Sequence, residues 1–127
     1  MIFITGGEKD VLSLSAHGFN AICFNSETAQ IPENIIEGLL LRFRHLIILY
    51  DTDETGLRGT KRQVEALSKF KVLHLTLPLQ GTKTEKDISD YFALGNGSEG
   101  LKALLSDMFT QMYAQTMMIL QSCEIDY

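Results

Sequence analysis

The chain has few of the residues that cross-link a fold through covalent bonds or metal ions. Its 127 residues include two cysteines, Cys23 and Cys123, in no Cys-x-x-Cys arrangement, so neither a disulfide framework nor a zinc site is indicated. The three histidines do not have metal-ligand spacing. No apolar run approaches the roughly 18 residues that a membrane span needs, and no signal-peptide pattern opens the chain. These absences predict a protein of the reducing cytoplasm without a membrane partner.

Positive charge is also scarce. The chain carries 11 lysines and arginines against 16 acidic residues, which gives a net charge of -5. Such a surface does not attract nucleic acid by bulk electrostatics, so any contact with nucleic acid must be local or bridged by a metal. A composition of 45% apolar and 21% charged residues is typical of a globular domain that buries its own core.

Strand-like and helix-like segments alternate along the chain. Short apolar runs predict strands at 2–5, 19–24, 46–50 and 71–78. Apolar residues at helical spacing predict helices between them at 8–18, 32–43 and 56–69, and a short helix beginning at Lys86. Strands that alternate with helices form parallel sheets. The sequence therefore predicts a compact α/β fold with a parallel sheet of about four strands and helices on both faces.

A long amphipathic segment follows these alternating units. Beyond Ser98, apolar residues recur at helical spacing, namely Leu101, Leu104, Leu105, Met108, Phe109, Met112 and Tyr113. We expect a domain over residues 1–97 and a C-terminal helix over residues 98–127. This helix is expected to pack on the domain or to lead to a further domain.

Two carboxylates follow the third predicted strand. Residues 46–49 are aliphatic without polar alternation, as in strands covered on both faces, and Asp51 and Asp53 come just after them. Ligands of open α/β sheets bind beyond the carboxyl ends of the strands. Carboxylate oxygens that converge there predict a site for a hard cation such as Mg²⁺. An alternative is that the aspartate and threonine side chains only cap the helix that follows.

Three α/β families place an aspartate after a central strand. Asp51, Asp53 and Thr55 match the DxDxT motif of haloacid-dehalogenase phosphatases. That family begins with this strand, however, and needs a longer downstream stretch than this chain offers. Receiver domains require an acidic pair after the first strand, where this chain has Gly6 and Gly7.

The third family, the toprim domain, agrees with the chain in the order of its motifs. Residues 4–10 read Ile-Thr-Gly-Gly-Glu-Lys-Asp, and residues 49–56 read Leu-Tyr-Asp-Thr-Asp-Glu-Thr-Gly. Together they resemble the two toprim motifs, and the resemblance covers almost the whole chain. It is strongest to the toprim modules of DNA primases and phage-type primase-helicases, in which a segment similar to residues 86–91 supplies a further acid.

This resemblance implies a metal site and a role in DNA replication. Asp51, Asp53 and Asp87 correspond to ligands of Mg²⁺ or Mn²⁺. The expected partners are nucleotides, nucleic acid such as single-stranded DNA or a primer-template, and other domains of a longer chain. The implied activity is that of a primase-like nucleotidyltransferase. Two alternatives stay open: a toprim nuclease of the overcoming-lysogenization type, and a degenerate module that only binds nucleic acid or a partner protein.

The chain departs from the toprim pattern at one position. Gly6 stands where the family has its catalytic glutamate, and a glycine can neither transfer a proton nor ligate a metal through a side chain. Glu8 is the candidate substitute, with the alternative that it is a charge at the start of a helix. Asp10 matches a family aspartate, and we expect it to form a buried hydrogen bond between its helix and a loop.

Basic residues and one polar loop complete the expected site. Arg58, Lys61, Arg62 and Lys86 are candidates for contacts to phosphate, although a solvated helix face explains the first three as well. The polar residues 25–29 fall where primases of this kind have a loop beside the site, and the resemblance implies that they line the same cleft.

Overall fold

The computed structural model describes residues 1–24 and 30–125, with side chains up to residue 119. The loop predicted at 25–29 lies outside these described residues. The chain divides into two compact units, residues 1–96 and residues 97–127. The first unit contains the sheet, and the second contains one helix.

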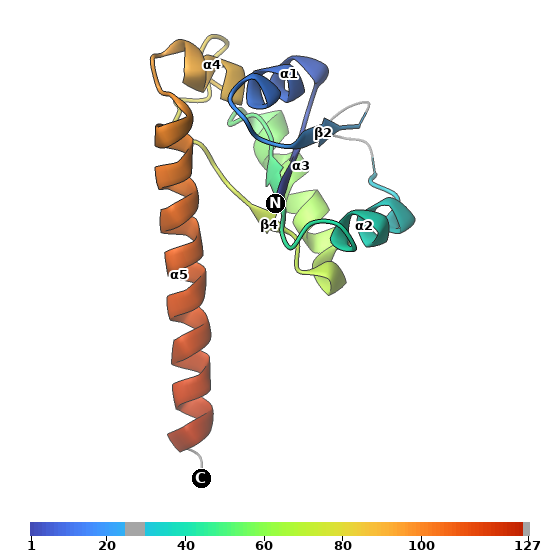
Figure 1. The fold of residues 1–127 in the computed structure, drawn as a ribbon, viewed down its shortest axis with the longest axis vertical. Helices are drawn as coiled ribbons and strands as arrows, with labels where there is room; N and C mark the ends of the chain where they lie inside the picture. The colour runs from blue at the N-terminus through green and yellow to red at the C-terminus, as the bar shows by residue number, and fades with distance from the viewer. Residues whose placement is uncertain (25–29, 126–127) are drawn as a thin grey trace. The chain divides into compact units, whose positions relative to one another are not determined.

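A parallel four-stranded sheet forms the centre of the first unit (Figure 1). Its strands are β1 (Ile2–Thr5), β2 (Ala21–Cys23), β3 (Leu46–Leu49) and β4 (Leu73–His74), in the spatial order β2-β1-β3-β4. Ile4 pairs with Ile22 on one side and with Ile48 on the other. The carboxyl ends of β1 and β3 are therefore neighbours. The connection from β1 leads to β2 on one side and the connection from β3 leads to β4 on the other, so a topological switch point lies between β1 and β3.

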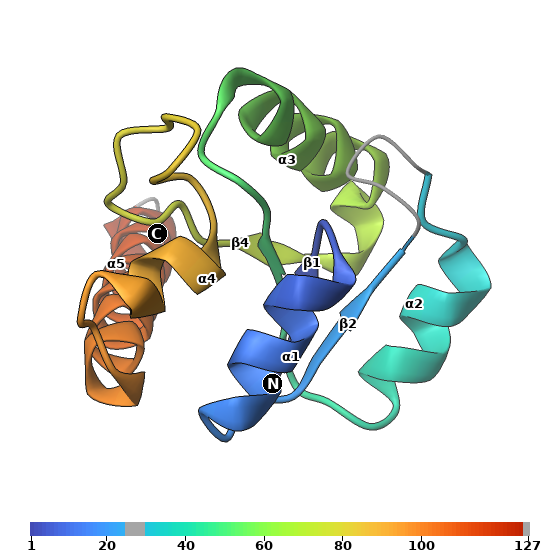
Figure 2. The ribbon, with the colours of Figure 1, turned by 90° about the horizontal axis from the view of Figure 1, so that it is seen from above.

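Helices cover both faces of this sheet. They are α1 (Glu8–Ala16), α2 (Glu33–Leu40), α3 (Glu54–Ala66) and α4 (Ile88–Ala93), with a short 3-10 helix, η1, at Ser68–Phe70. Figure 2 shows α1 and α3 on opposite sides of the sheet. Because side chains alternate along a strand, Ile4 and Ile48 join the cluster that contains Ile36 of α2, whereas the Phe3 ring lies edge-on to Phe19, with ring centroids 5.8 Å apart. The α/β fold predicted from the sequence is confirmed.

The fourth strand is much shorter than predicted. The sequence indicates a strand over 71–78, but β4 contains only Leu73 and His74. The backbone N–H of Leu75 still donates to the carbonyl of Ile48 at 3.0 Å. Among the described residues β4 pairs with β3 alone, which ends at Leu49, so no second strand there extends the pairing. The predicted strand at 19–24 and the predicted helix at 32–43 are likewise shortened, to β2 and α2.

The second unit consists of α5 (Ser98–Ile125), so the predicted C-terminal helix is confirmed. Several of its large apolar side chains are exposed, among them Tyr113, Met118 and Ile119. Its predicted packing on the first domain stays a prediction. Within the described part of the chain, no helix is both long and apolar enough to cross a membrane.

Candidate metal centre

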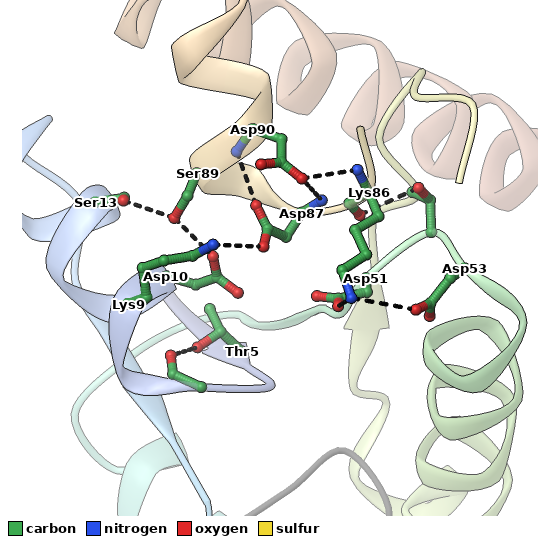
Figure 3. Close-up of polar contacts among 12 residues, drawn as sticks. Thr5, Lys9, Asp10, Ser13, Asp51, Asp53, Lys86, Asp87, Ser89 and Asp90 are labelled. Atoms are coloured by element: carbon green, nitrogen blue, oxygen red, sulfur yellow. Dashed lines mark hydrogen bonds and ion pairs between the residues drawn. The ribbon is translucent and has the colours of Figure 1, made fainter. Parts of the chain in front are cut away.

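Three carboxylates converge beyond the carboxyl ends of β1 and β3. Asp10, Asp51 and Asp87 each offer one oxygen, and these oxygens all lie within 4.8 Å of one another. Asp10 and Asp87 are buried, and the side chain of Asp51 is 15% exposed. We call these three residues the acidic triad. Figure 3 shows its members approaching from α1, from the end of β3 and from the start of α4.

Local structure positions each member of the triad. Asp51 follows the buried strand β3 by two residues, and Asp10 lies in the first turn of α1, directly after β1. Asp87 is the N-cap of α4. Its Oδ1 accepts a hydrogen bond from the backbone N–H of Asp90 at 2.8 Å, and Asp90 in turn accepts from the backbone N–H of Asp87 at 3.3 Å. This reciprocal capping box fixes the direction of the Asp87 carboxylate.

Two hydrogen bonds tie the loop after β3 to the segment before α4. Thr52, which is buried, donates to the carbonyl oxygen of Lys86 both from its backbone N–H, at 2.7 Å, and from its Oγ1, at 3.1 Å. The two segments are 34 residues apart in sequence. These bonds explain why Asp51 and Asp87, on either side of this junction, come together.

A pair of serines holds Asp10. Ser89 Oγ donates to Asp10 Oδ1 at 2.8 Å, and the hydroxyls of Ser13 and Ser89 are 2.7 Å apart. Burial of the Asp10 carboxyl raises its pKa to about 6. The bond from Ser89 opposes this rise, and the charges of Asp87 and Asp51 add to it. Ionisation of Asp10 therefore costs free energy in this buried site.

Two lysines partly compensate the triad. Lys9 Nζ lies 3.2 Å from Asp87 Oδ2. Lys86 Nζ lies 3.5 Å from Asp51 Oδ2 and 3.6 Å from Asp53 Oδ2. The hydrogen bond to Asp87 raises the pKa of Lys9, and the charge of Asp51 raises the pKa of Lys86, so both ammonium groups are charged at neutral pH.

The donor set fits a hard divalent cation. Carboxylate oxygens are the ligands that Mg²⁺ and Mn²⁺ prefer, and a set of three from separate elements leaves other coordination positions for water or phosphate oxygens. A dication would also favour the ionised form of Asp10, whose pKa is raised first by burial and then by the charges of Asp87 and Asp51. Asp10, Asp51 and Asp87 are therefore the residues that could hold it.

Comparison with protein-family models gives one result that bears on this site. A family model described as Toprim-like matches residues 3–92. The chain belongs to the toprim family. Toprim domains bind divalent metals through acidic residues and generally handle nucleic acid, and all three residues of the acidic triad lie within the matched segment. Comparisons with curated proteins and with solved structures gave no match.

The predicted metal ligands take different positions in this toprim domain. Asp51 and Asp87 belong to the triad, whereas Asp53 is the N-cap of α3 and accepts a hydrogen bond from the backbone N–H of Gly56 at 2.9 Å. Asp53 thus caps the helix, as the alternative interpretation of the motif expects, whereas Asp51 belongs to a cluster that could hold a metal. Direct ligation by Asp53 stays a prediction.

Asp10 has a larger part than the sequence suggested. The expected hydrogen bond is present, but its donor is Ser89 of α4 and not a loop residue, and the same carboxylate also faces Asp51 and Asp87. Sequence reasoning did not include Asp10 among the metal ligands. The available signal was its match to a family aspartate. No spacing rule singles out Lys9 or Ser89.

Glu8 is exposed at the first position of α1, next to its N-cap Gly7. Among the described residues, the group of acids close enough to hold a metal does not include it. Glu8 lines a separate cavity of about 380 Å³ together with Gly7, Cys23 and Phe24. Its role as a substitute for the family glutamate stays a prediction.

The basic candidates fall into two groups. Lys86 reaches the triad through its contact with Asp51. Arg58 instead pairs with Glu54 on its own helix at 3.3 Å, and with Arg62 it lines a cavity of about 140 Å³ along α3. Lys61 lines a cavity of about 300 Å³ between α3 and β4. Contacts of these three residues with phosphate stay predictions.

Proposed function

We propose that this chain is the metal- and phosphate-handling toprim domain of a DNA primase or primase-helicase-like replication protein. The observation that carries the proposal is the convergence of Asp10, Asp51 and Asp87 within 4.8 Å beyond the sheet. The primase type is supported by the similarity of residues 86–91 to the segment that supplies a further acid in those modules. The substrate class is a nucleotide or nucleic-acid phosphate.

The residues of the site have distinct roles in this proposal. The acidic triad holds Mg²⁺ or Mn²⁺, and a bound dication supplies the positive charge that attracts phosphate oxygens and stabilises negative charge on them. Ser89 fixes one oxygen of Asp10, and the capping box fixes Asp87. Asp53 holds the start of α3 in place behind Asp51.

A metal titration tests the proposal. Mn²⁺ binding is measured by isothermal titration calorimetry on the full chain, on Asp51→Asn and on Asp107→Asn, which removes an exposed carboxylate of α5. We expect Asp51→Asn to weaken binding at least about 10-fold, because it removes one of three charged ligands, and Asp107→Asn to leave it unchanged. Equal Mn²⁺ affinities for the chain and Asp51→Asn would refute the metal site.

A second candidate function is a toprim module that binds nucleic acid without turnover. It is favoured by Gly6, which replaces the family glutamate, and by the exposed position of Glu8 outside the triad. Labelled single-stranded DNA with Mn²⁺ and nucleoside triphosphates separates the possibilities. Incorporated nucleotide supports the primase type, and shortened DNA supports a nuclease. Metal-dependent binding without either product, with activity gained in Gly6→Glu, supports the binding module.

A further inference from the structure

Lys86 places a positive charge beside one member of the acidic triad. Its Nζ lies between Asp51 Oδ2, at 3.5 Å, and Asp53 Oδ2, at 3.6 Å, and the side chain is 33% exposed (Figure 3). Both distances exceed those of short charge-assisted hydrogen bonds, which are about 2.7–2.9 Å. The ammonium therefore neutralises two carboxylates at once without being locked to either.

The backbone of Lys86 is held firmly, in contrast to its ammonium group. Its carbonyl accepts the two hydrogen bonds from Thr52, and its N–H donates to Asp90 Oδ2 at 3.0 Å. The Cα therefore stays beside the triad when the side chain moves. A four-carbon stem with rotatable bonds lets the ammonium leave Asp51 and still remain next to the site.

Asp51 links this lysine to the metal, because it belongs both to the triad and to the ion pair with Lys86. A dication on Asp51 repels an ammonium a few ångströms away and takes over the negative charge that held it. The ammonium then keeps Asp53 as one partner and has room for a second anion in place of Asp51. A phosphate that binds the metal would lie close enough for the Lys86 ammonium to contact it.

We propose that Lys86 is an exchangeable counter-ion: it neutralises Asp51 and Asp53 in the metal-free site and turns to the substrate phosphate once a divalent cation binds. This inference rests on the proposed function, since it needs the triad to hold a metal. The recognised chemistry is a phosphate ester, supplied by a nucleotide or by a nucleic-acid backbone. Lys9 is less suited to this exchange. Its side chain is 69% exposed, and its partner Asp87 is held in place as the N-cap of α4.

The test compares Mn²⁺ and phosphate binding in Lys86→Gln, in Lys86→Arg and in the matched control Lys69→Gln. Lys69→Gln removes one positive charge from an exposed ion pair with Glu33 in the same unit. Because the competing charge is gone, Lys86→Gln is expected to bind Mn²⁺ about 10-fold more tightly than the unmodified chain. Lys86→Arg keeps the charge and is therefore expected to tighten Mn²⁺ binding less than Lys86→Gln does. Lys69→Gln lies elsewhere and is expected to bind Mn²⁺ like the unmodified chain.

Phosphate binding is measured at saturating Mn²⁺ with two probes, a nucleoside triphosphate and a short single-stranded DNA. Lys86→Gln is expected to weaken binding of the probe that supplies the natural phosphate by about 10-fold, as loss of a charge-assisted contact implies. The probe that loses affinity identifies the source of the phosphate. Unchanged affinity for both probes would overturn the proposal.

Failure of this inference is distinguishable from failure of the metal site. If Asp51→Asn weakens Mn²⁺ binding but Lys86→Gln does not tighten it, the metal site stands and the exchange is wrong. If Asp51→Asn leaves Mn²⁺ binding unchanged, both the proposed function and the exchange are refuted.

Discussion

Asp10 is the carboxylate of the site whose ionised form is disfavoured by burial and by its neighbours. It is 6% exposed, and it lies beside two other carboxylates. Its pKa rises from the ordinary 3.8 to about 6, first because of burial. At neutral pH the metal-free protein therefore holds a charge that costs folding free energy, which a bound cation would recover.

Asp10→Asn is expected to stabilise the metal-free protein at neutral pH. Between pH 3.8 and about 6 the folded carboxyl keeps a proton that the unfolded chain has released. The contribution of Asp10 to the free energy of unfolding is therefore present at low pH and is lost as the pH rises through about 6. At pH 7.5 the substitution should add up to roughly 2–3 kcal/mol to the free energy of unfolding, because one pKa unit corresponds to about 1.4 kcal/mol.

Urea unfolding in a chelator at pH 4 and at pH 7.5 measures this difference. The gain should shrink at pH 4, where Asp10 keeps its proton in the folded state. The same variant should lose Mn²⁺ affinity, because it removes one charged ligand. A variant that is less stable than the unmodified chain at pH 7.5 would show that the Asp10 charge is compensated in the fold.

At the scale of elements, the junction of β3 and α3 has no room for a side chain. A Cβ on Gly56 would lie 2.0 Å from the carbonyl oxygen of Asp51, and the N–H of Gly56 donates to Asp53. The glycine after the Asp-x-Asp motif thus lets α3 start directly against the backbone of a triad residue. Gly81 makes a similar approach, since a Cβ there would lie 2.7 Å from the Thr52 carbonyl.

Gly56→Ala is expected to push α3 away from Asp51. Overpacking against a fixed backbone should lower the free energy of unfolding by about 3 kcal/mol and weaken Mn²⁺ binding. The control is Gly38→Ala, at an exposed position inside α2 with open space around the added methyl. It should raise stability by up to about 1 kcal/mol, because alanine favours helices over glycine. Thermal unfolding measures the stability of both variants. Equal stabilities of Gly56→Ala and Gly38→Ala would argue against the close contact at Gly56.

At the scale of the whole molecule, the net charge predicts that any binding of nucleic acid depends on a metal. The chain carries -5 overall, which repels a phosphate backbone unless a cation intervenes. We expect labelled single-stranded DNA to bind at least about 10-fold more tightly in Mg²⁺ than in a chelator, by fluorescence anisotropy. Asp51→Asn should bind equally weakly in both buffers. Tight binding in the chelator would mean that a basic surface such as that of α3 acts alone.

Much of the fold follows from local pattern. The aliphatic run at 46–49, the alternation of strands with helices and the helix from Ser98 are confirmed, because strand and helix periods and burial are encoded in neighbouring residues. The extent of the fourth strand could not be predicted in this way. Residues 75–78 have a strand-like composition, but pairing depends on where the distant β3 ends.

The sequence by itself determined that an aspartate follows a buried strand and that a second acidic segment lies near residue 87. Only the tertiary structure decided which carboxylates meet. In the structure Asp53 caps the start of α3, and Asp10 lies beside Asp51 and Asp87. Lys86 forms an ion pair with Asp51. The physical reason is that such a site depends on the directions of side chains from three separate elements. Bonds such as those between Thr52 and Lys86 fix these directions, and no spacing along the chain encodes them.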